Sequence, residues 1–148
     1  MSPALTHYED FEVGVAHEVG PYLLSAAEIR DFAGRWDPLP MHLEVQPGAP
    51  AISASGAHLM AIRTALLHRL GGGRPPAIVA ALGWERVRFH RPAFAGDALS
   101  LRLTTIERRP SSSRPGAGVV TSEVVLVNAA GEPILSHHDA ILVAMRSP

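Results

Sequence analysis

The sequence of 148 residues contains neither cysteine nor lysine. The absence of cysteine excludes disulfide bonds and catalysis by a thiol, and it is compatible with a cytoplasmic location. All thirteen basic residues are therefore arginine. Arginine, alanine, glycine and proline have GC-rich codons, so the composition points to a GC-rich bacterial genome.

Two other features are missing, and each excludes a class of partner. No apolar run approaches the roughly 18 residues that span a membrane, and the amino-terminal segment MSPALTHYEDFE has neither a basic start nor an apolar signal core. The formal net charge is -1, which gives no electrostatic support for nucleic-acid binding. We therefore expect neither a membrane nor a nucleic acid as partner.

The residues that are present predict a globular chain. Hydrophobic residues make up 47% and charged residues 18% of the sequence. A chain of this length buries roughly two thirds of its unfolded surface, which is enough for a proper core. We expect one domain over residues 1–148.

The first third of the chain predicts a strand, a short helix and a long loop. A strand is expected near residues 16–24. Ser25 and Glu28 have the spacing of a capping box, in which each side chain bonds the other residue's amide, so a helix should run to about Trp36. Pro38 should end that helix, because the residue before a proline avoids the helical region. Four prolines and a glycine in residues 37–50 predict a loop without regular structure.

A long apolar helix is the clearest predicted element. It should begin after Gly56, run to about Leu70, and stop at the three glycines that follow. One face carries an apolar stripe at helical spacing, formed by Leu59, Ile62, Leu66 and Leu70.

The rest of the chain predicts β-strands. Strands are expected over residues 78–89 with a kink at Gly83, then over 98–106, 119–127 and 134–145, with a flexible turn over 109–116. A run of strands that can form an antiparallel sheet, together with a single helix long enough to cover it, predicts an α+β fold.

The loop segment WDPLPMHLE concentrates two proton carriers among apolar residues. Asp37 and His42 lie five positions apart, and Pro38 and Pro40 between them have a fixed φ. A rigid loop of this kind can hold a carboxylate and an imidazole toward one pocket, where they could activate a water. The simpler interpretations are that Asp37 caps the following turn and that His42 is an exposed loop histidine.

The start of the long helix offers hydrogen-bond donors. Its first amides, near Gly56 and Ala57, carry the positive end of the helix dipole and can hold a negative oxygen. Ser55 is most simply the N-cap of this helix, and it could also line the pocket. Gly83 is either a strand kink or a backbone donor to substrate.

Three motifs together resemble the MaoC-type hot-dog dehydratases, the family of (R)-specific enoyl-CoA hydratases. They are DPLPMH, SGAH at the start of the long helix, and VRFHRPAFAGD over residues 87–97. The resemblance implies a single hot-dog fold, with the long helix wrapped by a curved antiparallel sheet, and a homodimer with active sites at the subunit interface. It implies reversible addition of water to a 2-enoyl thioester of coenzyme A or an acyl-carrier protein, as in fatty-acid metabolism. No cofactor and no metal are expected.

The resemblance also implies roles for individual residues. Asp37 would be the base and His42 its water-orienting acid/base partner. Substrate-binding positions would be Ser55, Gly56, Ala57 and Gly83. The chain departs from the family pattern at Leu39, where the hydratases usually have asparagine, and at residues 55–57, where they often have His-Gly-Met.

Two alternatives to the hydratase remain open at this point. In a hot-dog thioesterase, the water activated by Asp37 would attack the thioester carbonyl instead of C3. In a non-catalytic subunit, the chain would only bind an acyl thioester or pair with an active copy, and Leu39 in place of asparagine keeps this alternative open. Arg86, Arg88 and Arg91 could meet the phosphates of coenzyme A, or they could form a solvated strand face.

Overall fold

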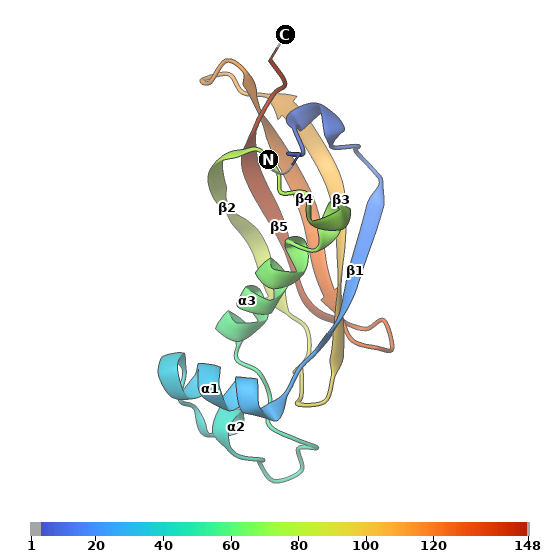
Figure 1. The fold of residues 1–148 in the computed structure, drawn as a ribbon. Coiled ribbons are helices and arrows are strands. Elements are labelled where there is room, and N and C mark those ends of the chain that lie inside the picture. The colour runs from blue at the N-terminus through green and yellow to red at the C-terminus, as the bar shows by residue number, and fades with distance from the viewer. Residues whose placement is uncertain (1–3, 148) are drawn as a thin grey trace.

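The computed structural model describes residues 4–147, so the expected domain limits at residues 1 and 148 lie outside the described part. Five strands and three α-helices make up the fold (Figure 1): β1 (Ala16–Leu23), α1 (Ala26–Trp36), α2 (Pro40–Leu43), α3 (Gly56–Leu67), β2 (Ile78–Phe89), β3 (Ala98–Pro110), β4 (Ala117–Val127) and β5 (Pro133–Ala144). Short 3-10 helices cover Tyr8–Asp10 and Leu70–Gly73. Within residues 4–147 no helix is long and apolar enough to cross a membrane.

The strands form one antiparallel sheet in the order β1-β3-β4-β5-β2. Alternating side chains set its two faces, as in β3, where Leu99 and Leu101 are fully buried while Arg102 is exposed. The sheet curves around α3, and α1 and α2 lie at the end of the molecule where α3 begins (Figure 1). The predicted α+β fold, with one long helix against an antiparallel sheet, is confirmed.

The packing of α3 forms the centre of the core. Leu59, Ile62 and Leu66 are buried to 3% exposure or less, in a cluster that includes residues of β3, β4 and β5. The helix ends at Leu67, three residues earlier than predicted, and Leu70 lies in the 3-10 turn that follows. The α-helix therefore ends before the three glycines that were predicted to stop it; Gly71 and Gly72 lie in the 3-10 turn, with φ values of 59° and 69°, which glycine adopts at little cost.

Some local predictions are wrong, for identifiable reasons. Residues 37–50 are not wholly irregular, because Pro40 begins a one-turn helix at the first helical position, where the missing amide is not needed. The capping box at α1 is only half formed. Ser25 Oγ accepts from the Glu28 amide at 3.2 Å, but the Glu28 carboxylate accepts from Tyr22 and His58 instead of from the Ser25 amide.

The turn predicted over residues 109–116 starts later than expected. Arg109 pairs with Val119 and Pro110 with Gly118, so β3 continues to Pro110. Proline has no amide hydrogen to donate to a neighbouring strand, but this costs little at the last position of a strand, where the pairing ends.

Truncation of the α3 stripe should destabilise the whole fold. Leu66 has no exposed surface, so Leu66→Ala leaves a cavity and should lower the free energy of unfolding by about 2–5 kcal/mol. Urea denaturation followed by circular dichroism measures this loss. Leu23→Ala is the matched control, because Leu23 is 72% exposed and its truncation should change the same quantity by less than about 0.5 kcal/mol. Equal effects of the two substitutions would contradict the assignment of Leu66 to the core.

Candidate functional site

Asp37 and His42 are brought together by the end of α1 and the single turn of α2. Asp37 is the C-cap of α1, with its amide donating to the carbonyl oxygen of Ala33 at 2.9 Å. His42 lies in the third position of α2, and its Nε2 is 3.7 Å from Oδ2 of Asp37. The two side chains predicted to act together therefore do face each other, across a gap slightly too long for a direct hydrogen bond.

A backbone contact fixes the orientation of the His42 ring. Its Nδ1 lies 2.6 Å from the carbonyl oxygen of Ser53. Because a carbonyl only accepts, Nδ1 must carry the proton, and in the neutral ring Nε2 presents a lone pair toward Asp37. The His42 side chain is only 7% exposed, whereas that of Asp37 is 37% exposed. The alternative of an exposed loop histidine is thus wrong, and the carboxylate is the group that faces the open side.

The start of α3 lies close to this pair. Ser55 is its N-cap, fully buried, and its Oγ accepts from the His58 amide at 3.2 Å, as the sequence predicted. Gly56 and Ala57 are the first two residues of the helix, and such amides have no acceptor inside the helix. A Cβ on Gly56 would lie 2.7 Å from Cζ of Phe89, so only glycine lets the Phe89 ring pack this closely on the helix start.

Gly83 is not brought together with the other predicted residues. It has a φ of 148°, and the β2–β5 register shifts between Ala81 and Gly83, which is the geometry of a strand kink. Phe89, the β2 residue that contacts the helix start, lies six positions further along the strand, or about 20 Å away. Within one chain, Gly83 therefore lies too far away to donate to the same bound group.

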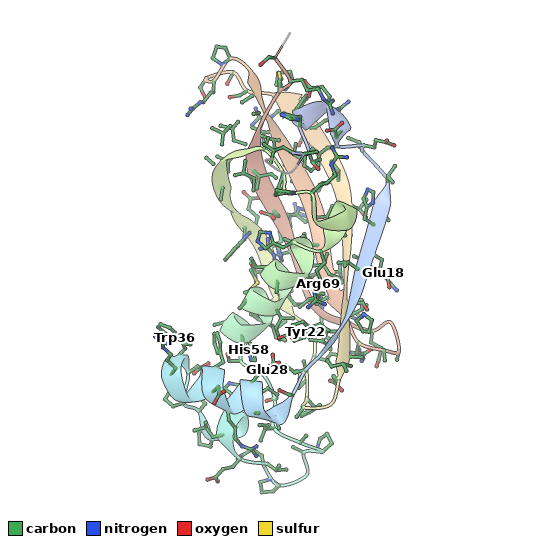
Figure 2. The ribbon with its side chains drawn as sticks, in the orientation of Figure 1. Glu18, Tyr22, Glu28, Trp36, His58 and Arg69 are labelled. Carbon is green, nitrogen blue, oxygen red and sulfur yellow. The ribbon has the colours of Figure 1, made fainter. Side chains whose placement is uncertain are left out.

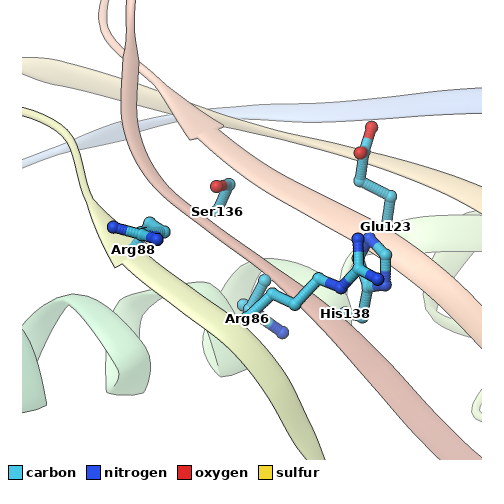
Figure 3. Close-up of a pocket in the computed structure, with 6 residues that line it drawn as sticks. Arg86, Arg88, Glu123, Ser136 and His138 are labelled. Carbon is cyan, nitrogen blue, oxygen red and sulfur yellow. The ribbon is translucent and has the colours of Figure 1, made fainter.

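Two pockets of the described residues lie elsewhere. The larger, about 460 Å³, is lined by Arg86, Arg88, Glu123, Ser136, His137 and His138, and Figure 3 shows it on the sheet with α3 behind the strands. The second, about 230 Å³, includes Gly83, His138 and Ala140. Neither is lined by Asp37 or His42. Arg86 and Arg88 are brought together in the larger pocket, whose lining does not include the Asp37–His42 pair.

A partly buried polar cluster beside the site was not predicted. The Glu28 carboxylate oxygen Oε1 accepts from the Tyr22 hydroxyl at 2.8 Å and lies 3.1 Å from Nε2 of His58. The His58 ring stacks on Phe32 with centroids 4.6 Å apart. Burial lowers the pKa of His58, and the neighbouring carboxylate opposes this shift. The capping-box spacing explained Glu28 locally, and no local pattern links it to His58, thirty residues further on.

A second buried cluster ties α3 to β5. Arg63 is 4% exposed, although it lies off the apolar stripe of α3. Its guanidinium donates to Asp139 at 2.7 Å and to Nε2 of His137 at 2.9 Å, and it lies over the Trp84 ring. A buried arginine needs such partners, which no sequence periodicity can reveal.

A metal site is not part of this arrangement. In the described residues no group of three or more histidine, aspartate or glutamate side chains is placed to hold a metal ion. His137 and His138 point to opposite faces of β5, as alternation predicts, and His137 is the buried one.

Comparison with known proteins identifies the fold. The solved structure of a MaoC-like dehydratase from Rhodospirillum rubrum aligns with a TM-score of 0.83 and 28% identity, covering 97% of this chain and 99% of that chain. An (R)-hydratase from A. caviae involved in PHA biosynthesis aligns with a TM-score of 0.70 and 21% identity, over 93% and 99% of the two chains. A conserved protein from Mycobacterium tuberculosis described as having a double hot-dog fold aligns with a TM-score of 0.77 and 17% identity, over 97% and 46% of the two chains. The chain therefore has the hot-dog fold, and its resemblance to the MaoC-like dehydratases is confirmed.

Sequence relatives are similar over a shorter segment. The mesaconyl-CoA hydratase of Haloarcula hispanica is 40% identical over 68 residues, which are 45% of this chain and 19% of that protein. The match thus spans about a fifth of the length of the curated relative. No protein-family model matches the chain.

The buried histidines should make stability depend on pH. Burial lowers the pKa of both His58 and His137. The pKa of histidine in an unfolded chain is about 6.5. Below that pH the unfolded state binds protons that the folded state does not. The free energy of unfolding should therefore fall as the pH falls, with a slope of at most about 1.4 kcal/mol per pH unit for each histidine, and it should be flat with respect to these groups above that pH.

Urea unfolding between about pH 5 and pH 7.5 measures this slope. His137→Gln should reduce the slope, whereas His138→Gln, on the adjacent and partly exposed position of β5, should leave it as in the wild type. A slope that is the same in all three proteins would contradict the assignment of this pH dependence to His137.

Proposed function

We propose that this chain is a hydratase/dehydratase that adds water reversibly to a 2-enoyl thioester. The observation that carries the proposal is the facing pair of Asp37 and His42, 3.7 Å apart, with the His42 ring held on the Ser53 carbonyl just before α3 begins. The similarity of part of the chain to a mesaconyl-CoA hydratase supports a thioester of coenzyme A, with an acyl-carrier thioester as the other member of the same class. The cysteine-free composition favours a cytoplasmic enzyme, and the residues with GC-rich codons favour a bacterial one.

The chemistry follows from the hydrogen-bonding state of the pair. With Nδ1 of His42 donating to the Ser53 carbonyl, its Nε2 and the Asp37 carboxylate are both acceptors. A single water can donate one hydrogen to each, which orients its oxygen lone pair for attack on C3 of the enoyl group. Asp37 takes the proton from this water as the new C–O bond forms, and the proton is returned to C2. The product carries the hydroxyl on C3 and one added hydrogen on C2.

The start of α3 would stabilise the charge that develops during this addition. Attack at C3 pushes electrons onto the thioester carbonyl oxygen and forms an enolate. The amides of Gly56 and Ala57, at the positive end of a twelve-residue helix, are suited to hold that oxygen. The Phe89 ring against Gly56 would keep water from those amides, and Ser55 would hold the helix start in place as its cap.

Removal of the base should abolish turnover without loss of binding. Asp37→Asn preserves shape but cannot accept the proton, so kcat on a consumed enoyl-CoA should fall by about 10²-fold or more with a nearly unchanged dissociation constant. His42→Ala should lower kcat by a similar factor. Asp31→Asn, on an exposed position of α1, is the matched control and should retain wild-type kcat. Full activity of Asp37→Asn on every thioester that the wild type consumes would show that the loop is structural.

The same assay separates the alternatives. Purified protein is incubated with crotonyl-CoA and with longer and branched enoyl-CoAs. Loss of the enoyl absorbance indicates hydration, release of free thiol indicates a thioesterase, and neither change with measurable thioester binding indicates a non-catalytic subunit. The exposed Leu39 beside Asp37 is the position at which asparagine can be introduced to test its effect on rate.

We further propose a homodimer joined through β2. This strand is an edge of the sheet, and large apolar side chains lie half exposed along it: Ile78, Leu82, Trp84, Val87 and Phe89. An unpaired apolar edge strand invites pairing with another chain, and a second copy in a twofold arrangement would cover it and continue the sheet. Phe89 links this edge to the start of α3, so the second copy would also border the candidate site.

The proposed dimer predicts different behaviour at the two sheet edges. At micromolar concentration, light scattering coupled to gel filtration should give twice the mass of one chain. Leu82→Lys places a charge on the β2 edge and should yield a monomer. Leu23→Lys, at a 72% exposed position on β1, should remain a dimer. A wild-type monomer at micromolar concentration would contradict the proposal.

A further inference from the structure

The Glu28 cluster joins three elements at one carboxylate. Tyr22 comes from β1, Glu28 from the first turn of α1, and His58 from the first turn of α3. Figure 2 shows the three side chains converging where these elements meet, with Glu18 further along β1. Oε1 of Glu28 lies 2.8 Å from the Tyr22 hydroxyl and 3.1 Å from Nε2 of His58.

The direction of each hydrogen bond follows from the protonation states. Burial and the neighbouring carboxylate raise the pKa of Tyr22, so its hydroxyl keeps its proton and donates. Burial lowers the pKa of His58, so the ring is neutral near pH 7, and its one proton belongs on Nε2, facing the carboxylate. Nδ1 is then a buried acceptor with no hydrogen-bond partner among the described side chains. One carboxylate oxygen thus receives two donors from two other elements.

This cluster connects the two halves of the candidate site. Helix α1 begins near Glu28 and is capped at its end by Asp37, and α3 begins two residues before His58 with its free amides. The His58 ring also stacks on Phe32, in the middle of α1. We infer that Glu28 and His58 are positioning residues, which hold α1 against the start of α3 and thereby set the distance between Asp37 and the amides of Gly56 and Ala57.

The inference rests on the proposed function, because that distance matters for a reaction that spans three atoms. The base must reach the water at C3 while the helix amides hold the oxygen on C1. A displacement of about 1 Å between such groups can cost up to about 10²-fold in rate. A loose junction between α1 and α3 would therefore lower kcat although no reacting group is missing.

The test compares disruption with restoration of the hydrogen bond. Glu28→Ala and His58→Leu remove the link, and His58→Leu keeps an apolar side chain of similar bulk in the buried site. His58→Gln returns a donor near the position of Nε2. Glu18→Ala is the control, because Glu18 lies on β1 in an exposed pair with Arg102 at 2.9 Å. Thermal melts by circular dichroism establish that each variant is folded at the assay temperature.

Two readouts are measured on these proteins. On an enoyl-CoA that the wild type hydrates, kcat should fall about tenfold or more in Glu28→Ala and His58→Leu, with KM within about twofold, and His58→Gln should recover part of the loss. Independently of activity, hydrogen exchange is followed over residues 37–44, whose amides bond Ala33, Leu39 and Pro40. Exchange there should be faster in the two disrupted variants and unchanged in Glu18→Ala.

The outcomes separate this inference from the proposed function. Unchanged exchange over residues 37–44 in both disrupted variants overturns the inference, whether or not the protein hydrates any thioester. Wild-type kcat in both disrupted variants overturns it as well, as does a loss of kcat that His58→Gln shares in full. If the wild type consumes no thioester but exchange rises as expected, the proposed function fails while the link between the cluster and Asp37 stands.

Discussion

The burial of α3 against the curved sheet is the constraint on which the rest of the structure depends. Its Leu59, Ile62 and Leu66 side chains fill the concave face, and α3 is the only helix of the described residues that lies along the sheet (Figure 1). Because the apolar stripe fixes both the rotation and the position of the helix, its amino terminus has one location. Everything that the candidate site requires is built around that end.

The site itself is assembled by polar contacts more than by apolar packing. The segment from Asp37 to Ser53 is tied down by the His42 ring on the Ser53 carbonyl and by the Ser53 amide on the Met41 carbonyl. Arg30 in α1 donates to the Leu43 carbonyl at 3.1 Å. Directional bonds of this kind hold a loop in one geometry where few apolar contacts are available. A rigid loop is what a facing carboxylate and imidazole need if they are to share one water.

The surface of the chain is unusually apolar in two places. The β2 edge is one, and the segment around Asp37 is the other, where Trp36 is 65% exposed and Leu39 and Met41 about half exposed. Contiguous apolar surface on a soluble chain usually marks a contact site. The proposed dimer accounts for the first patch. The second surrounds the proposed base, where an acyl chain would need an apolar surface.

Local patterns in the sequence determined a large part of this protein. The stripe in α3 and the alternation in the strands predicted the α+β fold, because helix and strand periods are properties of neighbouring residues. The facing of Asp37 and His42 was also predictable, since five residues with two prolines leave little conformational freedom. Residues 55–57 at the helix start followed from the same local chemistry. Pro40 shows the limit of such patterns, because a helix can begin at proline as well as end there.

Only the tertiary structure decided which distant side chains meet. Glu28 fits a capping box by sequence, yet its carboxylate bonds Tyr22 and His58, because packing places two better donors beside it. Arg63 lies off the apolar stripe, yet it is buried with Asp139, 76 residues away. Such pairs depend on the position of a helix on a sheet, and the total burial of apolar surface decides that position. No spacing within the chain encodes the position, so these contacts appear only once the fold is complete.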